Sequence, residues 1–147
     1  MKVLSLDIAS TTGWAIDTKV YGTWDFKTKK DESMGMKLIR FRSKLKEVHE
    51  LEPLDIVIYE RPAGQHANSI IHQAKLIAIL EEFCEENNIE YRAFSASEIK
   101  KFATGKGNAN KQEMIDAAKT KYGYTGSDDN EADAILMREL FRQELNL

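Results

Sequence analysis

Three acidic residues adjoin apolar segments, and their type and placement suit metal-dependent chemistry. Asp7 and Glu60 each end a short apolar run, and Asp133 lies between two alanines just before an isoleucine and a leucine. A carboxylate beside the core is costly unless its charge is offset. Divalent cations such as Mg²⁺ offset it, because they take oxygen ligands. The sequence therefore predicts a nuclease-like metal site where Asp7, Glu60 and Asp133 meet.

Two residues just before Asp133 are candidates for a fourth ligand. Asp129 lies four positions earlier and Asn130 three positions earlier, so both fall near the same face of a helix. Asp129 and its neighbour Asp128 are also natural capping residues for the start of that helix. The residues alone leave the choice between Asp129 and Asn130 open.

Positive charge is concentrated in one part of a chain whose net charge is -3. The stretch 99–122 is +4, because six lysines there face only two acids. A cluster of this size suits a local anionic partner, and a solvated helical face is the alternative. The six are Lys100, Lys101, Lys106, Lys111, Lys119 and Lys121.

Several classes of site are excluded by residue usage. Cys84 is the one cysteine, so an internal disulfide and a thiolate cluster are ruled out, and a buried structural thiol is expected. The three histidines lack the spacing of zinc ligands. Signal-peptide and membrane-span patterns are missing, which favours a cytoplasmic protein. With 147 residues, the chain is expected to form a single domain, 1–147.

Hydrophobic periodicity predicts the elements that would position these residues. The order of strands and helices indicates a three-layer α/β fold, with a mixed five-stranded sheet and helices on both faces. Strands are expected at 2–9, 14–17, 20–26, 55–60 and 89–94, with a turn at 10–13. Helices are expected at about 33–49, 67–86, 110–121 and 128–145. Residues 95–98 have the pattern of a capping box or first turn before a further short helix that ends at about 102.

The chain resembles the RuvC-type Holliday junction resolvases of the ribonuclease H-like superfamily, particularly their short bacteriophage members. The matching stretches are 7–15, 56–60, 99–100 with 105–111, and 130–134. The resemblance covers nearly the whole chain. It implies a ribonuclease H-like fold and a crossover junction endodeoxyribonuclease of DNA recombination and repair, which in a phage would act in the host cytoplasm.

The resemblance also implies roles for individual residues. Two Mg²⁺ ions, with Mn²⁺ as an alternative, would be held by Asp7, Glu60 and Asp133. Lys111 would approach the scissile phosphate and Lys100 would contact the backbone nearby, with Lys101 and Lys106 as further DNA contacts. A homodimer would place two such sites on four-way or other branched DNA.

Two departures from the family pattern bear on these expectations. Asn130 stands where the family usually has an acidic residue or a histidine, so Asp129 or Asn130 is the expected fourth ligand. The segment 61–64 lacks the aromatic residue that stacks on bases in bacterial members. Since such stacking contributes roughly 1–3 kcal/mol, relaxed sequence preference is predicted. Arg61 either belongs to an ordinary strand-exit turn or holds a phosphate.

Parts of the sequence are also compatible with two other classes of function. A branched-DNA-binding module without catalysis is motivated by Asn130. An actin-like or sugar-kinase ATPase fragment is suggested by residues 7–13, which resemble the acidic phosphate loop of that fold. Those ATPases need two related domains, whereas this chain has room for one.

Overall fold

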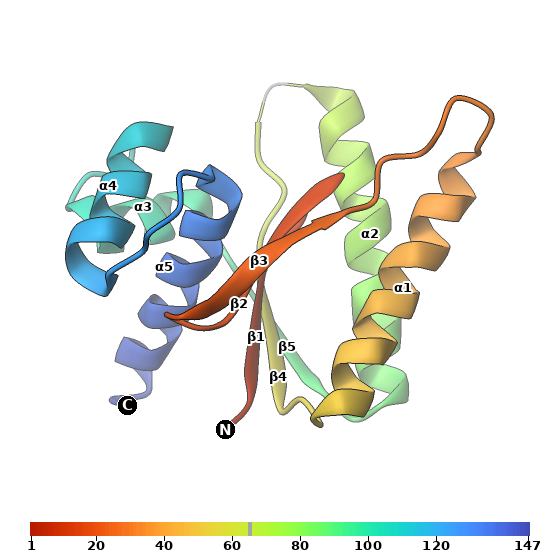
Figure 1. The fold of residues 1–147 in the computed structure, drawn as a ribbon, viewed down its shortest axis with the longest axis horizontal. Coiled ribbons are helices and arrows are strands. Elements are labelled where there is room, and N and C mark those ends of the chain that lie inside the picture. Colours follow the sequence, from red (N-terminus) through yellow and green to blue (C-terminus); the bar gives the residue numbers. More distant parts are fainter. Residues whose placement is uncertain (65) are drawn as a thin grey trace.

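The computed structural model describes residues 1–64 and 66–147, in which a five-stranded sheet separates two groups of helices (Figure 1). α1 and α2 cover one face, while α5 covers the other with α3 and α4 packed outside it. The strands are β1 (Val3–Asp7), β2 (Thr11–Asp17), β3 (Val20–Asp25), β4 (Ile56–Glu60) and β5 (Glu90–Phe94). The helices are α1 (Met34–Leu51), α2 (Ala67–Glu86), α3 (Ala96–Thr104), α4 (Lys111–Tyr122) and α5 (Asp129–Glu144).

The sheet has the strand order β3-β2-β1-β4-β5. β1, β2 and β3 form an antiparallel meander, whereas β4 is parallel to both β1 and β5. The carboxyl ends of β1, β4 and β5 therefore meet at one edge, at the top of Figure 1, where α2 and α5 begin. This edge is where functional residues of open α/β sheets gather.

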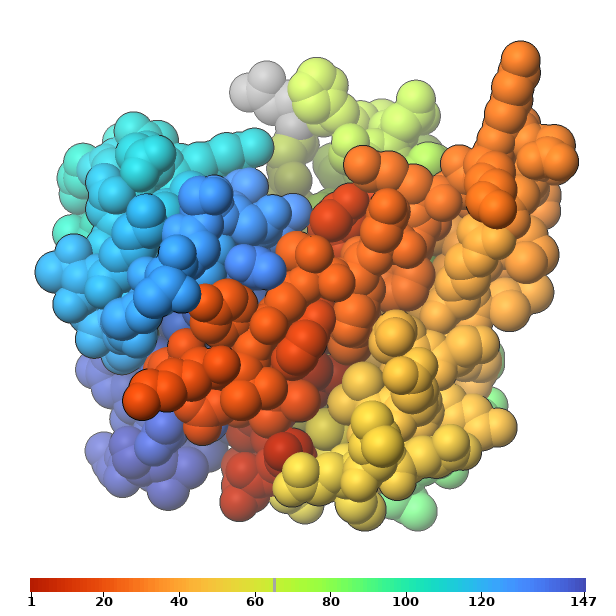
Figure 2. Space-filling view, viewed as in Figure 1, coloured from red at the N-terminus to blue at the C-terminus, as the bar shows by residue number. Residues whose placement is uncertain are grey.

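Alternating side chains of the central strands divide the core into two clusters. Leu4 and Leu6 face α1 and α2, while Val3 belongs to the cluster under α3, α4 and α5. Period-two alternation puts neighbouring residues of a strand on opposite faces, so both faces of β1 are buried. Figure 2 shows the β2–β3 ribbon crossing the visible face between the two helical groups.

Side-chain caps fix where the last three helices begin. Ser95 and Glu98 form the capping box expected of α3, and Asn110 and Glu113 form a second one at the start of α4. Asp128 accepts a hydrogen bond from the Glu131 backbone at 2.9 Å, which caps α5. Each satisfied cap holds the first turn of its helix in place.

The predicted α/β fold is confirmed, and most predicted element ends lie within two residues of the observed ones. The turn predicted at 10–13 is wrong from Thr11 onward, because Thr11 and Gly13 pair with Asp25 and Thr23 on β3. Cross-strand pairing overrides the turn preference of Ser, Thr and Gly. Burial raises the pKa of the Cys84 thiol to about 12, so the thiol stays protonated, as expected of a structural cysteine. Among the described residues, no helix has the length and apolar character needed to cross a membrane.

Candidate functional site

Asp7 and Glu60 lie at the carboxyl ends of adjacent parallel strands. Leu6 pairs with Tyr59 in the register of β1 and β4, and each is followed by one of the two acids. Neighbouring strands are about 4.8 Å apart, so the two carboxylates share one end of the sheet. The predicted meeting of these strands is therefore observed.

Two close contacts seat α5 directly on the sheet beside these acids. The Ser5 hydroxyl donates to the Ala134 carbonyl at 2.7 Å, and both residues are fully buried. A Cβ atom added at Gly13 would lie 2.2 Å from the Asn130 carbonyl oxygen, which is closer than real atoms approach. The lack of a side chain at Gly13 thus lets the start of α5 reach β2 and brings Asp133 to the strand acids.

The carboxylates of β1, β4 and α5 influence one another electrostatically. Burial raises the pKa of Asp7 well above its usual value, and the charges of Asp133, Glu60, Asp129 and Asp128 raise it further. Asp7 is only 8% exposed. A like charge within a few ångströms disfavours ionisation, so these carboxylates form one electrostatic cluster.

Asp133 also has a raised pKa, and in addition one of its carboxylate oxygens lacks a hydrogen-bond partner among the described residues. Burial raises its pKa to about 7, and the Glu60 and Asp129 charges contribute to the rise. Its Oδ1 atom is buried and has no hydrogen-bond partner among the described residues. An orphaned carboxylate oxygen beside other carboxylates is a position that a cation would satisfy.

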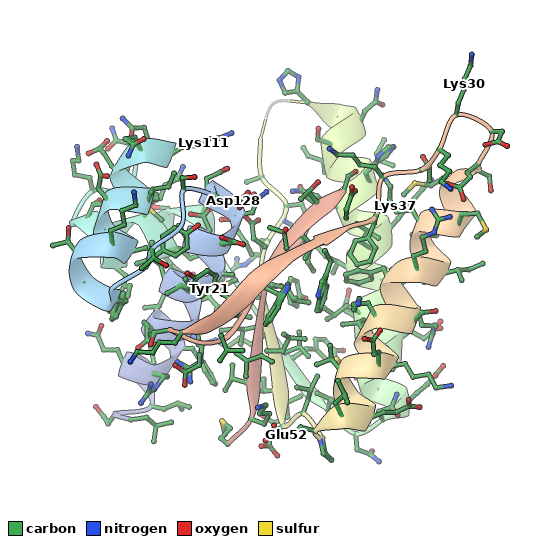
Figure 3. The ribbon with its side chains drawn as sticks, in the orientation of Figure 1. Tyr21, Lys30, Lys37, Glu52, Lys111 and Asp128 are labelled. Atoms are coloured by element: carbon green, nitrogen blue, oxygen red, sulfur yellow. The ribbon has the colours of Figure 1, made fainter. Side chains whose placement is uncertain are left out.

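Two lysines supply the opposing charge. Burial raises the pKa of Glu60, and the charge of Lys100 offsets part of that rise. Lys100 and Lys111 likewise offset part of the rise in the pKa of Asp133. The Lys111 Nζ atom lies 3.7 Å from Asp129 Oδ2, and the Lys111 side chain is 84% exposed. It extends from the start of α4 toward the middle of the molecule, at the same end as Asp128 (Figure 3).

Most of these groups open onto one cavity of about 520 Å³. Acidic and basic side chains both line this cavity, so it suits a ligand that carries a phosphate together with a cation. Among its lining residues are Glu60, Lys100, Asn110, Lys111, Asp129 and Asp133.

Comparison with solved structures identifies the fold. Thermus thermophilus RuvC superposes with a TM-score of 0.75 at 16% identity, over 99% of this chain and 97% of that chain. The chain has the RuvC fold. T. thermophilus RuvC in complex with a Holliday junction substrate gives 0.76 at 18% identity, over 98% and 96% of the two chains.

A more distant structure shares the RuvC fold. The yeast mitochondrial Holliday junction resolvase gives a TM-score of 0.63 at 14% identity, over 95% of this chain and 77% of that chain. No family model matches the sequence, and no curated protein is similar to it in sequence. The three-dimensional arrangement therefore carries the likeness.

Within the RuvC fold, Asp129 and Asn130 have different surroundings. Asp129 lines the cavity with Asp133 and pairs with Lys111. The Asn130 side chain instead donates to the Thr11 carbonyl at 3.3 Å, so it is held against β2.

The remaining predicted DNA-binding residues are spread around the site. Lys106, in the loop between α3 and α4, pairs with Glu113 at 2.5 Å. Arg61 is exposed just after β4, and its backbone donates to the Phe94 carbonyl at 2.8 Å. Lys101 lines a separate hollow between α3 and α5. The structure thus gathers Lys100 and Lys111 at the acids and leaves Lys101 outside that cavity.

The donor set fits a divalent cation by its chemistry. Asp7, Glu60, Asp129 and Asp133 offer only hard oxygen ligands, and their mutual repulsion would be relieved by positive charge. As the side chains stand, no group of three or more described His, Cys, Asp or Glu residues is arranged to hold a metal ion. A divalent cation at this cluster would therefore require the carboxylates to turn toward one another.

One polar residue that sequence reasoning did not select lies near the same end of the sheet. Lys37 in the first turn of α1 is only 5% exposed, and its ammonium donates to the Ser10 hydroxyl at 2.7 Å. A signal was present in the sequence, because Lys37 stands three after Met34 and four before Phe41 on the predicted apolar stripe. A lysine at such a position is expected to have a specific partner.

Proposed function

We propose that this chain is a metal-dependent, structure-selective endodeoxyribonuclease that resolves Holliday junctions and other branched DNA. The observation that carries the proposal is the cluster of buried, mutually repelling carboxylates from β1, β4 and α5, beside a cavity with two lysines. The RuvC fold supports it, because one of the similar structures is a RuvC in complex with a Holliday junction substrate.

Asp7, Glu60, Asp133 and Asp129 would hold two Mg²⁺ ions, with Mn²⁺ as an alternative. Asp129 is favoured over Asn130 as the fourth ligand because it lines the cavity, whereas the Asn130 amide is bonded to β2. The ions would supply activation of water and charge for the leaving oxygen in phosphodiester hydrolysis. Burial of the acids from water favours this binding, since an unpaired buried carboxylate is costly.

The lysines position the DNA and balance its charge. Lys111, exposed and able to swing away from Asp129, would place its ammonium on the scissile phosphate, where negative charge develops. Lys100, on the same cavity, would hold a neighbouring backbone phosphate. Phosphate contacts fix the register of DNA without reading its sequence.

Paired nicking of a four-way junction requires two active sites, so we propose a homodimer on branched DNA. Sequence preference is expected to be relaxed, because residues 61–64 contain no aromatic side chain to stack on a base. Arg61 lies at this exit from β4 and would contribute a backbone contact.

The test is cleavage of a synthetic four-way junction with Mg²⁺ by wild type and by the Asp7→Asn variant. The matched control is Asp31→Asn, which removes an exposed acid from the loop before α1. Wild type and the control should nick symmetrically placed strands, and Asp7→Asn should not. Equal cleavage by Asp7→Asn, or cleavage without a divalent ion, would overturn the assignment; metal-independent binding with no nicking would favour a DNA-binding module.

A further inference from the structure

The charge of Lys37 is not balanced by any acid in the described part of the chain. Among the described residues its Nζ atom has one hydrogen-bond partner, the Ser10 hydroxyl, although an ammonium offers three donors. By contrast, the half-exposed Lys2 pairs with Glu52 at 2.6 Å. Burying an ammonium without a counter-charge is unfavourable, so the position suits an anion brought by a ligand.

Ser10 connects this charge to a second cavity, here called the Ser10–Gln73 pocket. Its volume is about 320 Å³, at the lower end of the roughly 300–1,000 Å³ typical of small-molecule sites. Because the Ser10 oxygen accepts from Lys37, its own proton can be donated elsewhere, strengthened by the positive charge behind it. The pocket is lined by Ala9, Ser10, Thr11, Ser69, His72, Gln73, Leu76 and Asn130.

Gln73 adds an unsatisfied acceptor to the same pocket. Its Nε2 atom donates to the Ile8 carbonyl at 3.3 Å, which fixes the direction of the amide. Its Oε1 atom is buried and has no hydrogen-bond partner among the described residues. The pocket therefore offers a charge-assisted donor at Ser10 and an acceptor at Gln73, which together match a ligand that carries both an anion and an N–H group.

The Ser10–Gln73 pocket is lined in part by the loop that follows Asp7, and it shares no lining residue with the cavity of Lys100 and Lys111. The Phe26 backbone donates to the Ser10 carbonyl at 2.7 Å, so the loop is anchored to the end of β3. The segment after Phe26 carries three further lysines, and Lys30 projects outward from it, whereas Lys37 lies within the body near α2 (Figure 3). Asp31 and Glu32 follow these lysines, so the segment 27–32 has a net charge of +1.

We propose that the Ser10–Gln73 pocket binds one nucleotide of the branched DNA, with its phosphate on the Ser10 hydroxyl backed by Lys37. A base amino group then donates to Gln73 Oε1. This inference rests on the proposed function, and it adds a contact in a cavity other than that of Lys100 and Lys111. A nucleotide satisfies both the Ser10 hydroxyl backed by Lys37 and the acceptor Gln73 Oε1, whereas a bare phosphate leaves Gln73 Oε1 without a donor.

The first test measures junction binding in EDTA, so that cleavage does not interfere. Four-way junctions carry a single neutral methylphosphonate linkage at each position around the branch point in turn. One position should weaken binding by wild type about tenfold and leave Lys37→Met and Ser10→Ala unaffected, because the charge-assisted contact is already lost in those variants. Lys75→Met, an exposed lysine on α2, serves as the matched control and should respond like wild type.

The second test addresses the base. At the nucleotide identified by the first test, adenine is replaced by purine, which lacks the amino group. Wild type should bind this junction several-fold more weakly, whereas Gln73→Met should bind the two junctions equally. Equal binding of both junctions by wild type would overturn the base contact.

Folding provides a separate readout. Lys37→Met removes a buried ammonium, so its Tm should equal or exceed that of wild type if the lysine serves a ligand. If no linkage position is coupled to Lys37 or Ser10, the pocket is not a DNA site, whatever the Tm. Junction cleavage that persists alongside that result would overturn this inference alone, and failure of wild type to bind any junction would overturn the proposed function as well.

Discussion

The α5 side and the α2 side of the Asp7 loop handle positive charge differently. On the α5 side, Lys111 is exposed and sits 3.7 Å from an acid, so it can exchange that partner for a phosphate. On the α2 side, Lys37 is buried behind Ser10 and has no recorded acidic partner in the described chain. An exposed lysine can follow a changing charge, whereas a buried one holds a fixed position. The exposed Lys111 therefore suits a step in which charge develops, and the buried Lys37 suits holding a ligand in one position.

The largest expected effect comes from removing the charge of Asp7, the acid that precedes this loop. Asp7→Asn should lower the rate of junction nicking by at least about a hundredfold, because it removes a proposed metal ligand. The same change should raise the Tm of the metal-free protein, since a buried carboxylate repelled by its neighbours becomes neutral. Nicking assays measure the first effect and thermal unfolding measures the second. A fall in both the nicking rate and the Tm would assign Asp7 a structural role instead.

The contact that places α5 can be broken at Gly13. Gly13→Ala should destabilise the fold by about 2 kcal/mol, because its Cβ would press on the Asn130 carbonyl of the helix that carries Asp133. Nicking should fall together with stability, as measured by denaturant unfolding and junction cleavage. Gly35→Ala in α1 is the matched control, since its nearest contact would be an ordinary 3.7 Å. An unaltered Gly13→Ala protein would contradict the close seating of α5.

The carboxylate cluster should also respond to pH. The pKa of Asp133 is raised to about 7 from 3.8, so the folded protein keeps a proton that the unfolded chain has already lost between these values. Stability of the metal-free protein should therefore decrease as pH rises from about 4 to about 7, lowering the Tm by roughly 5 °C. Asp133→Asn should reduce this slope, and Mg²⁺ at pH 7.5 should restore the Tm. A slope unchanged in Asp133→Asn would argue against the cluster.

The smallest effect concerns the exposed lysine of the α5 side. Lys111→Met should lower the nicking rate about tenfold and change junction affinity much less, because its charge acts mainly on the developing negative charge. Lys119→Met, at an exposed position of the same helix, is the control. Single-turnover nicking and binding measurements separate the two contributions. Equal losses of rate and affinity would make Lys111 a simple DNA contact.

The fold was predictable because its signals are local and periodic. The stripe through Phe41 and Leu45 specifies α1, and the capping pair Ser95 and Glu98 specifies the start of α3. The strand acids were predictable for the same reason, since parallel strands must end together. The extension of β2 through Thr11 was not, because it depends on hydrogen bonds to β3 that are distant in sequence.

The different surroundings of Asp129 and Asn130 could be distinguished only in the three-dimensional structure. Both lie near one helical face, and only the packing of α5 against Thr11 and Gly13 distinguishes the cavity side from the sheet side. The partnership of Lys37 with Ser10 was likewise beyond sequence reasoning, although the apolar stripe marked Lys37 as unusual. Close approach between elements is a tertiary property that side-chain type alone does not encode.

The seating of α5 on β1 and β2 also bears on the order in which the chain can fold. Ser5 and Ala134 are 129 residues apart in sequence, and their hydrogen bond joins the strand that carries Asp7 to the helix that carries Asp133. A contact of such high sequence separation forms late in folding. The carboxylates of β1 and β4 therefore meet that of α5 only after this long-range contact has formed, so the acidic cluster assembles as a late step of folding.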